Sequence, residues 1–395
     1  MNEIYIMKKT ILCIDWSNLL FRALFINRLY GVKANMNYNT KEECKSFVYK
    51  FAMDVCSIIN IFRPQNVILL TDSSHAWRKD VYESYKSGRV KTDGVNWDNI
   101  YKCSDDLKKC FVNQGCHIAE TSHAEADDMA ALCKELLYDT DIDANIIIVS
   151  ADADIRQLIS FDKKTKKYCV VYNATTKGAT GKRYLYANQD FMDWYNTEDK
   201  VDIFFTNVDD NKCYIRDILN SNDKIELEVE NPNEILVHKI FCGDDGDNVP
   251  SFYDWAHNGK FVRITPGKEK KIREALNIST SDDIISNCDK LQAVFESVCK
   301  REIGDIDFNE RLVRQRTLVE LNSSLFPANI QEYKDSVKYM MDNNTLKFNG
   351  YLKASDVLQG TEYEGGDRKA SIEADIFKDL QRYGLVDNKE TNKLF

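Results

Sequence analysis

Three short apolar segments each run into aspartate, and this repeated pattern most constrains what the chain can fold into. The segments and the acids that follow them are residues 10–14 with Asp15, residues 67–70 with Asp72, and residues 146–149 with Asp152 and Asp154. Continuous apolar runs of this length are typical of strands buried in a parallel sheet. The pattern therefore predicts three such strands, each with acids at its carboxyl end.

Two segments between these strands have helical periodicity. Residues 41–62 and residues 124–138 both place apolar side chains three and four positions apart. Strands that alternate with helices predict an α/β fold, with a central, mostly parallel sheet flanked by helices. In such sheets, ligands bind outside the carboxyl ends of the strands.

A third group of acids opens the second helix. Glu125, Asp127 and Asp128 stand at its beginning, and a crossover helix runs antiparallel to its strands, so they should lie at the same edge of the sheet. Alone, acids in a first helical turn serve capping, and an aspartate after a strand is an ordinary turn residue. The convergence of seven acids on one edge instead favours a shared site.

The stretch FCGDDGDNVP, residues 241–250, adds acids at a bend. Asp244, Asp245 and Asp247 fall within four positions, among glycines and a proline that indicate a turn. Carboxylates this close raise one another's pKa unless a cation neutralises them. With Asp244 and Asp247, nine acids would share the site and account for most of the net charge of −10. The acidic balance then no longer argues against a nucleic-acid partner.

The chemistry of these side chains predicts the cation. Ligand sets made only of oxygen select Mg²⁺ or Mn²⁺ over zinc. Two such ions about 3.5–4 Å apart can activate water and stabilise the leaving oxygen in phosphodiester cleavage. A haloacid-type phosphatase does not fit, because it needs a second aspartate two residues after the first, where Ser17 stands.

Basic and aromatic residues follow the second strand. They are Arg78, Lys79, Lys86, Arg89 and Lys91, with Trp77, Tyr82 and Tyr85 between them. Cations hold phosphates and aromatic faces stack on unpaired bases, although a solvated amphipathic helix would have a similar pattern.

Five motifs in this order, DWSN, YKSGR, EADD, SADAD and GDDGDNVP, resemble the 5′ nuclease (flap endonuclease) family from residue 8 to about 330. The resemblance implies a PIN-like α/β nuclease fold in which two Mg²⁺ ions, replaceable by Mn²⁺, are held by Asp15, Asp72, Glu125, Asp127, Asp128, Asp152, Asp154, Asp244 and Asp247. It gives Lys86 a contact with the scissile phosphate, makes Arg78 a catalytic helper and makes Tyr85 a base-stacking residue. Asp245 occupies a variable position and is not expected to be a ligand.

By the same resemblance, GDDGDNVP begins a helix–three-turn–helix that grips duplex DNA. The stretch after it is longer than is usual in the family and resembles the T-even phage branch, whose members are RNases H. Candidate nucleic-acid contacts, besides Tyr85, are Lys79, Arg89, Lys260, Arg263, Lys268, Lys270 and Lys271. A surface helix without DNA contact is the alternative for the last five.

The resemblance also divides the chain. Residues 1–237 form the catalytic domain, with an arch at about 87–118 that has few core signals and a β-rich, family-atypical insertion at about 163–235. Residues 238–330 form the DNA-binding region, and residues 331–395 form a helical extension. Its last amphipathic helix, near residues 370–386, packs on the body or docks a sliding clamp or single-strand-binding protein.

Composition limits the setting. The chain has 395 residues, and no apolar run approaches the roughly 18 residues that span a bilayer. The N-terminus lacks a signal-peptide cleavage site, and the twelve cysteines are scattered as in reduced proteins. We expect a monomer in the cytoplasm, that of a bacterial host if the origin is a phage. No zinc site is expected, because histidines and cysteines do not fall into ligand spacing.

The predicted function is a magnesium-dependent 5′→3′ exonuclease and flap endonuclease with RNase H-type activity, leaving 5′-phosphates. Its substrates would be branched, nicked or flapped duplex DNA and RNA–DNA hybrid. It would remove RNA primers and adjacent DNA from the 5′ ends of lagging-strand fragments. Two alternatives remain: a PIN-class ribonuclease, which would lack GDDGDNVP, and an inactive replication scaffold, which would not need the full set of acids.

Overall fold

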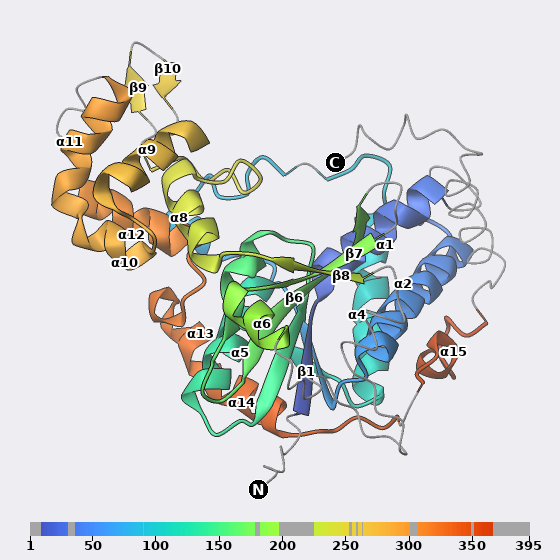
Figure 1. Cartoon of the computed structure of the whole chain (residues 1–395). Helices are drawn as coiled ribbons and strands as arrows, with labels where there is room; N and C mark the ends of the chain where they lie inside the picture. Colours follow the sequence, from blue (N-terminus) through green and yellow to red (C-terminus); the bar gives the residue numbers. More distant parts are fainter. Residues whose placement is uncertain are drawn as a thin grey trace, which may run out of the picture.

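The computed structural model describes residues 9–30, 36–89, 91–177, 182–196, 225–252, 255–257, 260–262, 264–300, 307–348 and 351–365. Within these ranges, an eight-stranded sheet forms the centre of a body covered by helices on both faces (Figure 1). A helical lobe lies beside this body. Among the described residues, no helix has the length and apolar character required to cross a membrane.

The strands of the sheet lie in the order β3-β2-β1-β4-β6-β7-β8, with β5 paired to β6. Their bounds are β1 Lys9–Asp15, β2 Asn66–Leu70, β3 His117–Ala119, β4 Ala144–Val149, β5 Ser160–Phe161, β6 Tyr168–Lys177, β7 Lys182–Ala187 and β8 Ile225–Val229. Strand β1 pairs in parallel with β2 and β4, and the parallel pairs β2–β3 and β4–β6 extend the sheet on either side. The predicted mostly parallel α/β architecture is confirmed.

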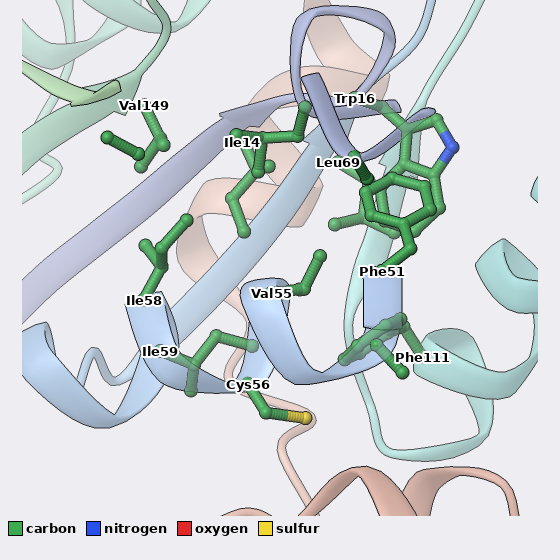
Figure 2. Packing of buried hydrophobic residues seen from close by; sticks show 14 of the residues in the cluster. Ile14, Trp16, Phe51, Val55, Cys56, Ile58, Ile59, Leu69, Phe111 and Val149 are labelled. Atoms are coloured by element: carbon green, nitrogen blue, oxygen red, sulfur yellow. The ribbon is translucent and has the colours of Figure 1, made fainter. Parts of the chain in front are cut away.

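Side chains of β1 alternate between two cores. Ile14 packs in the core under α1 Trp16–Tyr30, α2 Lys41–Phe62 and α4 Trp97–Asn113. Figure 2 shows Ile14 with Leu69 and Val149 of the neighbouring strands, facing Val55 and Ile58 of α2.

On the opposite face of the sheet, Ile11 and Cys13 pack in the core under α5 Ala126–Asp139 and α14 Lys334–Asp342. The predicted helix at 41–62 has its expected bounds, fixed by a capping box between Thr40 and Glu43.

A third core holds the helical lobe together. It contains Phe241, Phe252, Phe295 and Phe308, with Phe252 and Phe295 stacked at a centroid distance of 5.6 Å. The lobe comprises α8 Pro232–Cys242, β9 Trp255–His257, β10 Lys260–Val262, α9 Pro266–Leu276, α10 Ser281–Ser286, α11 Cys288–Cys299 and α12 Phe308–Val319. Tyr85, from the segment that follows β2, also belongs to this core and joins the lobe to the body.

The expectation that residues 87–118 contain few core residues is wrong for most of that segment. Residues 97–113 form α4, whose Ile100, Cys103, Leu107 and Phe111 are buried. Their three-and-four spacing is a helical signal, which the many polar residues between them obscured.

The described part of residues 163–235 is β-rich, as predicted, but its strands are part of the central sheet. Strand β6 pairs in parallel with β4, and β7 and β8 continue the sheet beyond it. Helix α6 Gln189–Tyr195 follows β7. Residues 197–224 lie outside the described residues, so the rest of the proposed insertion is not tested.

The described part of residues 331–395 packs on the catalytic body. Asn66 donates to the Met340 and Asn343 carbonyl oxygens, while Asn60 and Leu352 exchange two hydrogen bonds of 2.8 Å. The remaining elements are α3 Arg78–Val81, η1 Asp154–Leu158, η3 Ser323–Leu325, α13 Ala328–Glu332 and α15 Ala354–Val357. The predicted last helix near 370–386 lies outside the described residues.

Candidate active site

The carboxyl edge of the sheet gathers acids from four segments. Asp15 ends β1, Asp72 follows β2, Asp152 and Asp154 follow β4, and Glu125 precedes α5. The loop after α8 approaches the same edge from the lobe and contributes Asp244 and Asp247.

Asp15 is held in place by its neighbours at the strand ends. One carboxylate oxygen accepts from the Asn18 amide at 3.0 Å, and the other accepts from Ser150 Oγ at 2.8 Å. Burial, followed by the charge of Asp72, raises the pKa of Asp15 to about 7. Asp72 in turn accepts from the Ala126 amide at 2.7 Å, which ties the first turn of α5 to the end of β2.

Glu125, Asp127 and Asp128 form the first acidic group, in which each offers an oxygen within 4.8 Å of the others. Arg78 lies against all three, with ion pairs of 2.8 Å to Glu125, 3.7 Å to Asp127 and 2.8 Å to Asp128. Burial alone would raise the pKa of Glu125, but Arg78 and Lys86 bring it below its usual value. For Asp127, burial prevails and raises the pKa.

Asp128 is fully buried, and both of its oxygens are already engaged. Oδ2 accepts from Trp77 Nε1 at 3.0 Å and from the Glu125 amide at 2.9 Å, while Oδ1 faces Arg78. These contacts favour a positioning role for Asp128 over direct metal ligation.

Asp154, Asp244 and Asp247 form the second acidic group. Lys239 of α8 bridges two of them, 2.5 Å from Asp154 Oδ1 and in contact with Asp244 Oδ2. Burial, followed by the charge of Asp152, raises the pKa of Asp154 to about 7. The Gly246 amide donates to Asp244 Oδ1 at 2.7 Å and fixes its orientation.

Tyr85 and Lys86 connect the two acidic groups. The Tyr85 hydroxyl lies 3.2 Å from Glu125 Oε2 and 3.0 Å from Asp247 Oδ2. Lys86 Nζ contacts Glu125 Oε1 and lies 3.4 Å from Asp247 Oδ2, while its amide donates to the Asp247 carbonyl at 2.8 Å. Arg89 also contacts the Asp247 carboxylate.

The donor set fits hard divalent cations. Both groups offer oxygen alone, and Asp127 Oδ1 is a buried carboxylate oxygen without a hydrogen bond. Burial and neighbouring carboxylates raise the pKa values of Asp15 and Asp154, and a divalent ion bound at this edge would favour their ionised forms.

Burial of the side chain bears on two of the predicted roles. Tyr85 is only 2% exposed, so its ring cannot stack on a base, and its hydroxyl instead serves the carboxylates. Arg78 is only 1% exposed and is ion-paired with three acids, so the predicted helper role would act through the positions of these carboxylates.

Most of the predicted nucleic-acid contacts that the structure describes are exposed. Lys79, Arg89, Lys270 and Lys271 are exposed, and Lys268 is half-buried. The Lys260 side chain and all of Arg263 lie outside the described residues. Asp245 is exposed and is absent from both acidic groups.

Several residues that shape the site were not predicted. Lys239 lies five positions before Asp244, a spacing that only the turn after α8 converts into a contact. Trp77, Asn18 and Ser150 hydrogen-bond the acids, and the last two lie inside the motifs DWSN and SADAD. The motifs thus contain the supporting polar groups beside the acids.

The fold and the site define a resolvase-like α/β domain with clustered carboxylates at the strand ends. Residues 10–193 match the family model described as 5′-3′ exonuclease, N-terminal resolvase-like domain. That part of the chain is similar to this family, which confirms the resemblance noted in the sequence.

Curated relatives agree with this assignment. The chain is 26% identical to DNA polymerase I of Lactococcus lactis over 155 residues, which are 38% of this chain and 17% of that protein. It is 29% identical over 150 residues to the 5′-3′ exonuclease of Mycoplasmopsis pulmonis, covering 38% and 44% of the two chains. The corresponding protein of Mycoplasma pneumoniae is 22% identical over 282 residues, 71% of this chain and 77% of that one.

Solved structures share the fold. The flap endonuclease of bacteriophage T5, in a pseudo-enzyme-product complex with DNA and metal ions, has a TM-score of 0.51 at 16% identity. The match covers 85% of this chain and 100% of the T5 chain. The T5 protein co-crystallised with metal ions alone has a TM-score of 0.50 at 17% identity, covering 84% and 100%.

Proposed function

We propose that the protein is a magnesium-dependent nuclease that hydrolyses phosphodiester bonds at 5′ ends, as a 5′→3′ exonuclease and flap endonuclease. The observation that carries this proposal is the joining of two carboxylate groups through Lys86 and Tyr85 at the carboxyl edge of the sheet. The similarity of residues 10–193 to the 5′-3′ exonuclease family model supports the same activity.

The acids other than Asp128 would hold two Mg²⁺ ions, which supply an activated water and offset the charge that develops on the phosphate. Lys86 can meet a phosphate oxygen while it stays against Glu125 and Asp247, because its ammonium group lies between both carboxylates. Arg78 and Trp77 hold Asp128 and so fix the first turn of α5. Preorganised charges of this kind need little rearrangement during the reaction.

The substrates we propose are flapped, nicked or branched duplex DNA and RNA–DNA hybrid. The T5 relative has been solved with DNA, and exposed lysines on α9, Lys270 and Lys271, lie on the lobe that would receive the duplex. We propose that it removes RNA primers during replication in a bacterial cytoplasm, and the similarity to part of a DNA polymerase I supports a role in replication. A sliding clamp or single-strand-binding protein would be a partner in that process.

One assay tests the activity. A 5′-flap duplex, a nicked RNA–DNA hybrid and a single-stranded RNA, each labelled internally, are incubated with the protein in Mg²⁺ and then in EDTA. We expect 5′-phosphate products from the first two substrates, in Mg²⁺ alone. Cleavage restricted to single-stranded RNA would favour a PIN-class ribonuclease, and tight binding without cleavage in Mg²⁺ or Mn²⁺ would favour an inactive scaffold.

Variants of the acids test the site. Asp15→Asn and Asp152→Asn each remove a charge from the edge, so both should abolish cleavage and leave binding of a flap duplex largely intact. Lys86→Ala should slow cleavage more than it weakens binding. Binding should fall steeply as salt rises, because phosphate contacts release counterions. Near-normal turnover by both asparagine variants would contradict the metal assignment.

A further inference from the structure

A second cluster of metal-ligating side chains lies in the helical lobe, separate from the acidic edge. His238 and Cys242 on α8 face Glu269 on α9, and the three offer ligand atoms within 4.8 Å of one another. His238 Nδ1 lies 2.7 Å from Glu269 Oε2, and Cys242 Sγ lies 3.7 Å from the same oxygen.

The positions along the helices explain why these atoms meet. His238 and Cys242 are four residues apart, so they share one face of α8. Glu269 lies in the first turn of α9, which packs against that face beside α8 in the lobe (Figure 1). The sequence alone does not reveal this cluster, because Glu269 lies 27 positions beyond Cys242.

The two carboxylate oxygens of Glu269 have different surroundings, and only Oε1 is paired with a positively charged arginine. Arg273 lies 3.4 Å from Oε1 and is also paired with Glu234 at 3.5 Å, so its guanidinium group is turned to the far side of the carboxylate. Oε2 faces His238 and Cys242. The Glu269 side chain is only 6% exposed, whereas the His238 side chain is 43% exposed. The cluster is therefore buried on the Glu269 side and open to solvent on the His238 side.

We propose that His238, Cys242 and Glu269 bind a zinc-type divalent cation, with solvent at the fourth position. One nitrogen, one sulfur and one oxygen ligand suit Zn²⁺, whereas the oxygen-only edge of the sheet suits Mg²⁺. Binding would break the 2.7 Å His238–Glu269 hydrogen bond, and the ring proton on Nδ1 would pass to Nε2 or to solvent. The Cys242 thiol would lose its proton to solvent as the sulfur–metal bond forms.

The ion would join α8 to α9, the two helices that flank the turn and the hairpin of the lobe. Because α8 also carries Lys239, which bridges Asp154 and Asp244, the same helix reaches both sites. The proposal does not depend on nuclease activity, since it rests on ligands that the acidic edge does not use.

Cobalt substitution tests the site directly. The purified protein is titrated with Co²⁺ in the presence of excess Mg²⁺, which competes for the acidic edge, and absorbance is recorded. A cysteine ligand gives a thiolate-to-cobalt charge-transfer band in the near ultraviolet, and carboxylates do not. We expect this band at one Co²⁺ per chain, together with the visible bands of tetrahedral cobalt, and its displacement by one equivalent of Zn²⁺.

Variants separate the cluster from other thiols. Cys242→Ser should abolish the charge-transfer band, and His238→Ala should weaken Co²⁺ binding at least tenfold. Cys299→Ser is the matched control, since Cys299 is another half-buried cysteine of the same lobe, and it should retain the band. Circular dichroism confirms that each variant is folded. Absence of the band in the unsubstituted protein, or its persistence in Cys242→Ser, would overturn the proposal.

Discussion

Asp15 should make the stability of the metal-free protein depend on pH, and a bound metal ion should reverse that dependence. Its pKa in the folded chain is raised from 3.8 to about 7, so the folded state binds a proton that the unfolded state releases between these values. Stability of the metal-free protein should therefore fall as pH rises from about 4 to 7, by up to about 4 kcal/mol from this group.

Urea unfolding in EDTA at pH 5 and pH 8 measures this effect. Asp15→Asn should lose part of the pH dependence, and Mg²⁺ should stabilise the unsubstituted protein more at pH 8 than at pH 5. Equal pH dependence in the two proteins would contradict the assignment of the raised pKa to Asp15.

A substitution at Tyr85 can separate the contribution of its ring to cleavage from that of its hydroxyl. Tyr85→Phe keeps the ring in the core of the lobe and removes the group that lies against Glu125 and Asp247. A hydrogen bond to a charged group contributes about 1.5–3 kcal/mol, so we expect cleavage to fall roughly 10- to 100-fold, with a higher Mg²⁺ requirement. Wild-type kinetics in this variant would support a role for the ring alone.

Single residues differ in how far the sequence predicts them. Asp15, Asp72, Asp152 and Asp154 were predictable, because strand ends in a parallel sheet share one edge. The burial of Arg78 could not be predicted, because it depends on three acids that lie 47 to 50 positions further along the chain. Local spacing thus predicts where charged residues lie along the sheet edge, whereas tertiary packing determines which of them are exposed to solvent.

The turn after α8 depends on Gly243. Its φ of 74° and ψ of −162° lie in a region that is essentially restricted to glycine, and an added Cβ would lie 2.4 Å from the Val249 carbonyl oxygen. Gly243→Ala should therefore destabilise the protein by about 2 kcal/mol or more and displace Asp244 enough to impair cleavage. Thermal unfolding and the flap assay measure both effects.

Gly267 provides the matched control for this substitution. It lies in the first turn of α9, and a Cβ there would meet nothing within 4 Å. Gly267→Ala should leave stability unchanged or raise it by up to about 1 kcal/mol, because alanine favours the helix. Similar losses in both variants would show that the turn geometry is not the cause.

Elements with one strong periodicity were predicted well, and those defined by their partners were not. Helix α2 has its predicted bounds because its apolar face and its cap agree. Helix α4 was missed although it has a comparable buried face, because its exposed side is highly polar. Strands β7 and β8 were recognised as β-structure, but only their pairing places them in the central sheet.

At the scale of the whole molecule, the C-terminal part completes the body. Met341 of α14 is fully buried under the sheet, whereas Tyr339 on the same helix is 62% exposed. Met341→Ala should lower the free energy of unfolding by about 2–5 kcal/mol. Tyr339→Ala should change it by no more than about 0.5 kcal/mol.

The effects of these two substitutions are measured by unfolding, monitored by tryptophan fluorescence and by circular dichroism. If α14 were an independent extension, Met341→Ala would lower only a separate, earlier transition. The contacts of Lys9 Nζ with the carbonyl oxygens of Met341 and Asp342 instead tie this helix to the first strand, so we expect the main transition itself to shift.

The contact between Tyr85 and Asp247 spans 162 positions of the chain, which affects when the protein becomes active. A chain still on the ribosome with only its first 240 residues made has every strand-end acid, yet it lacks Asp244, Asp247 and the turn that orients them. The proposed activity can therefore appear only after translation has passed this loop and α8 has left the exit tunnel. An incomplete nascent chain would therefore not cleave the nucleic acid around it by the proposed activity.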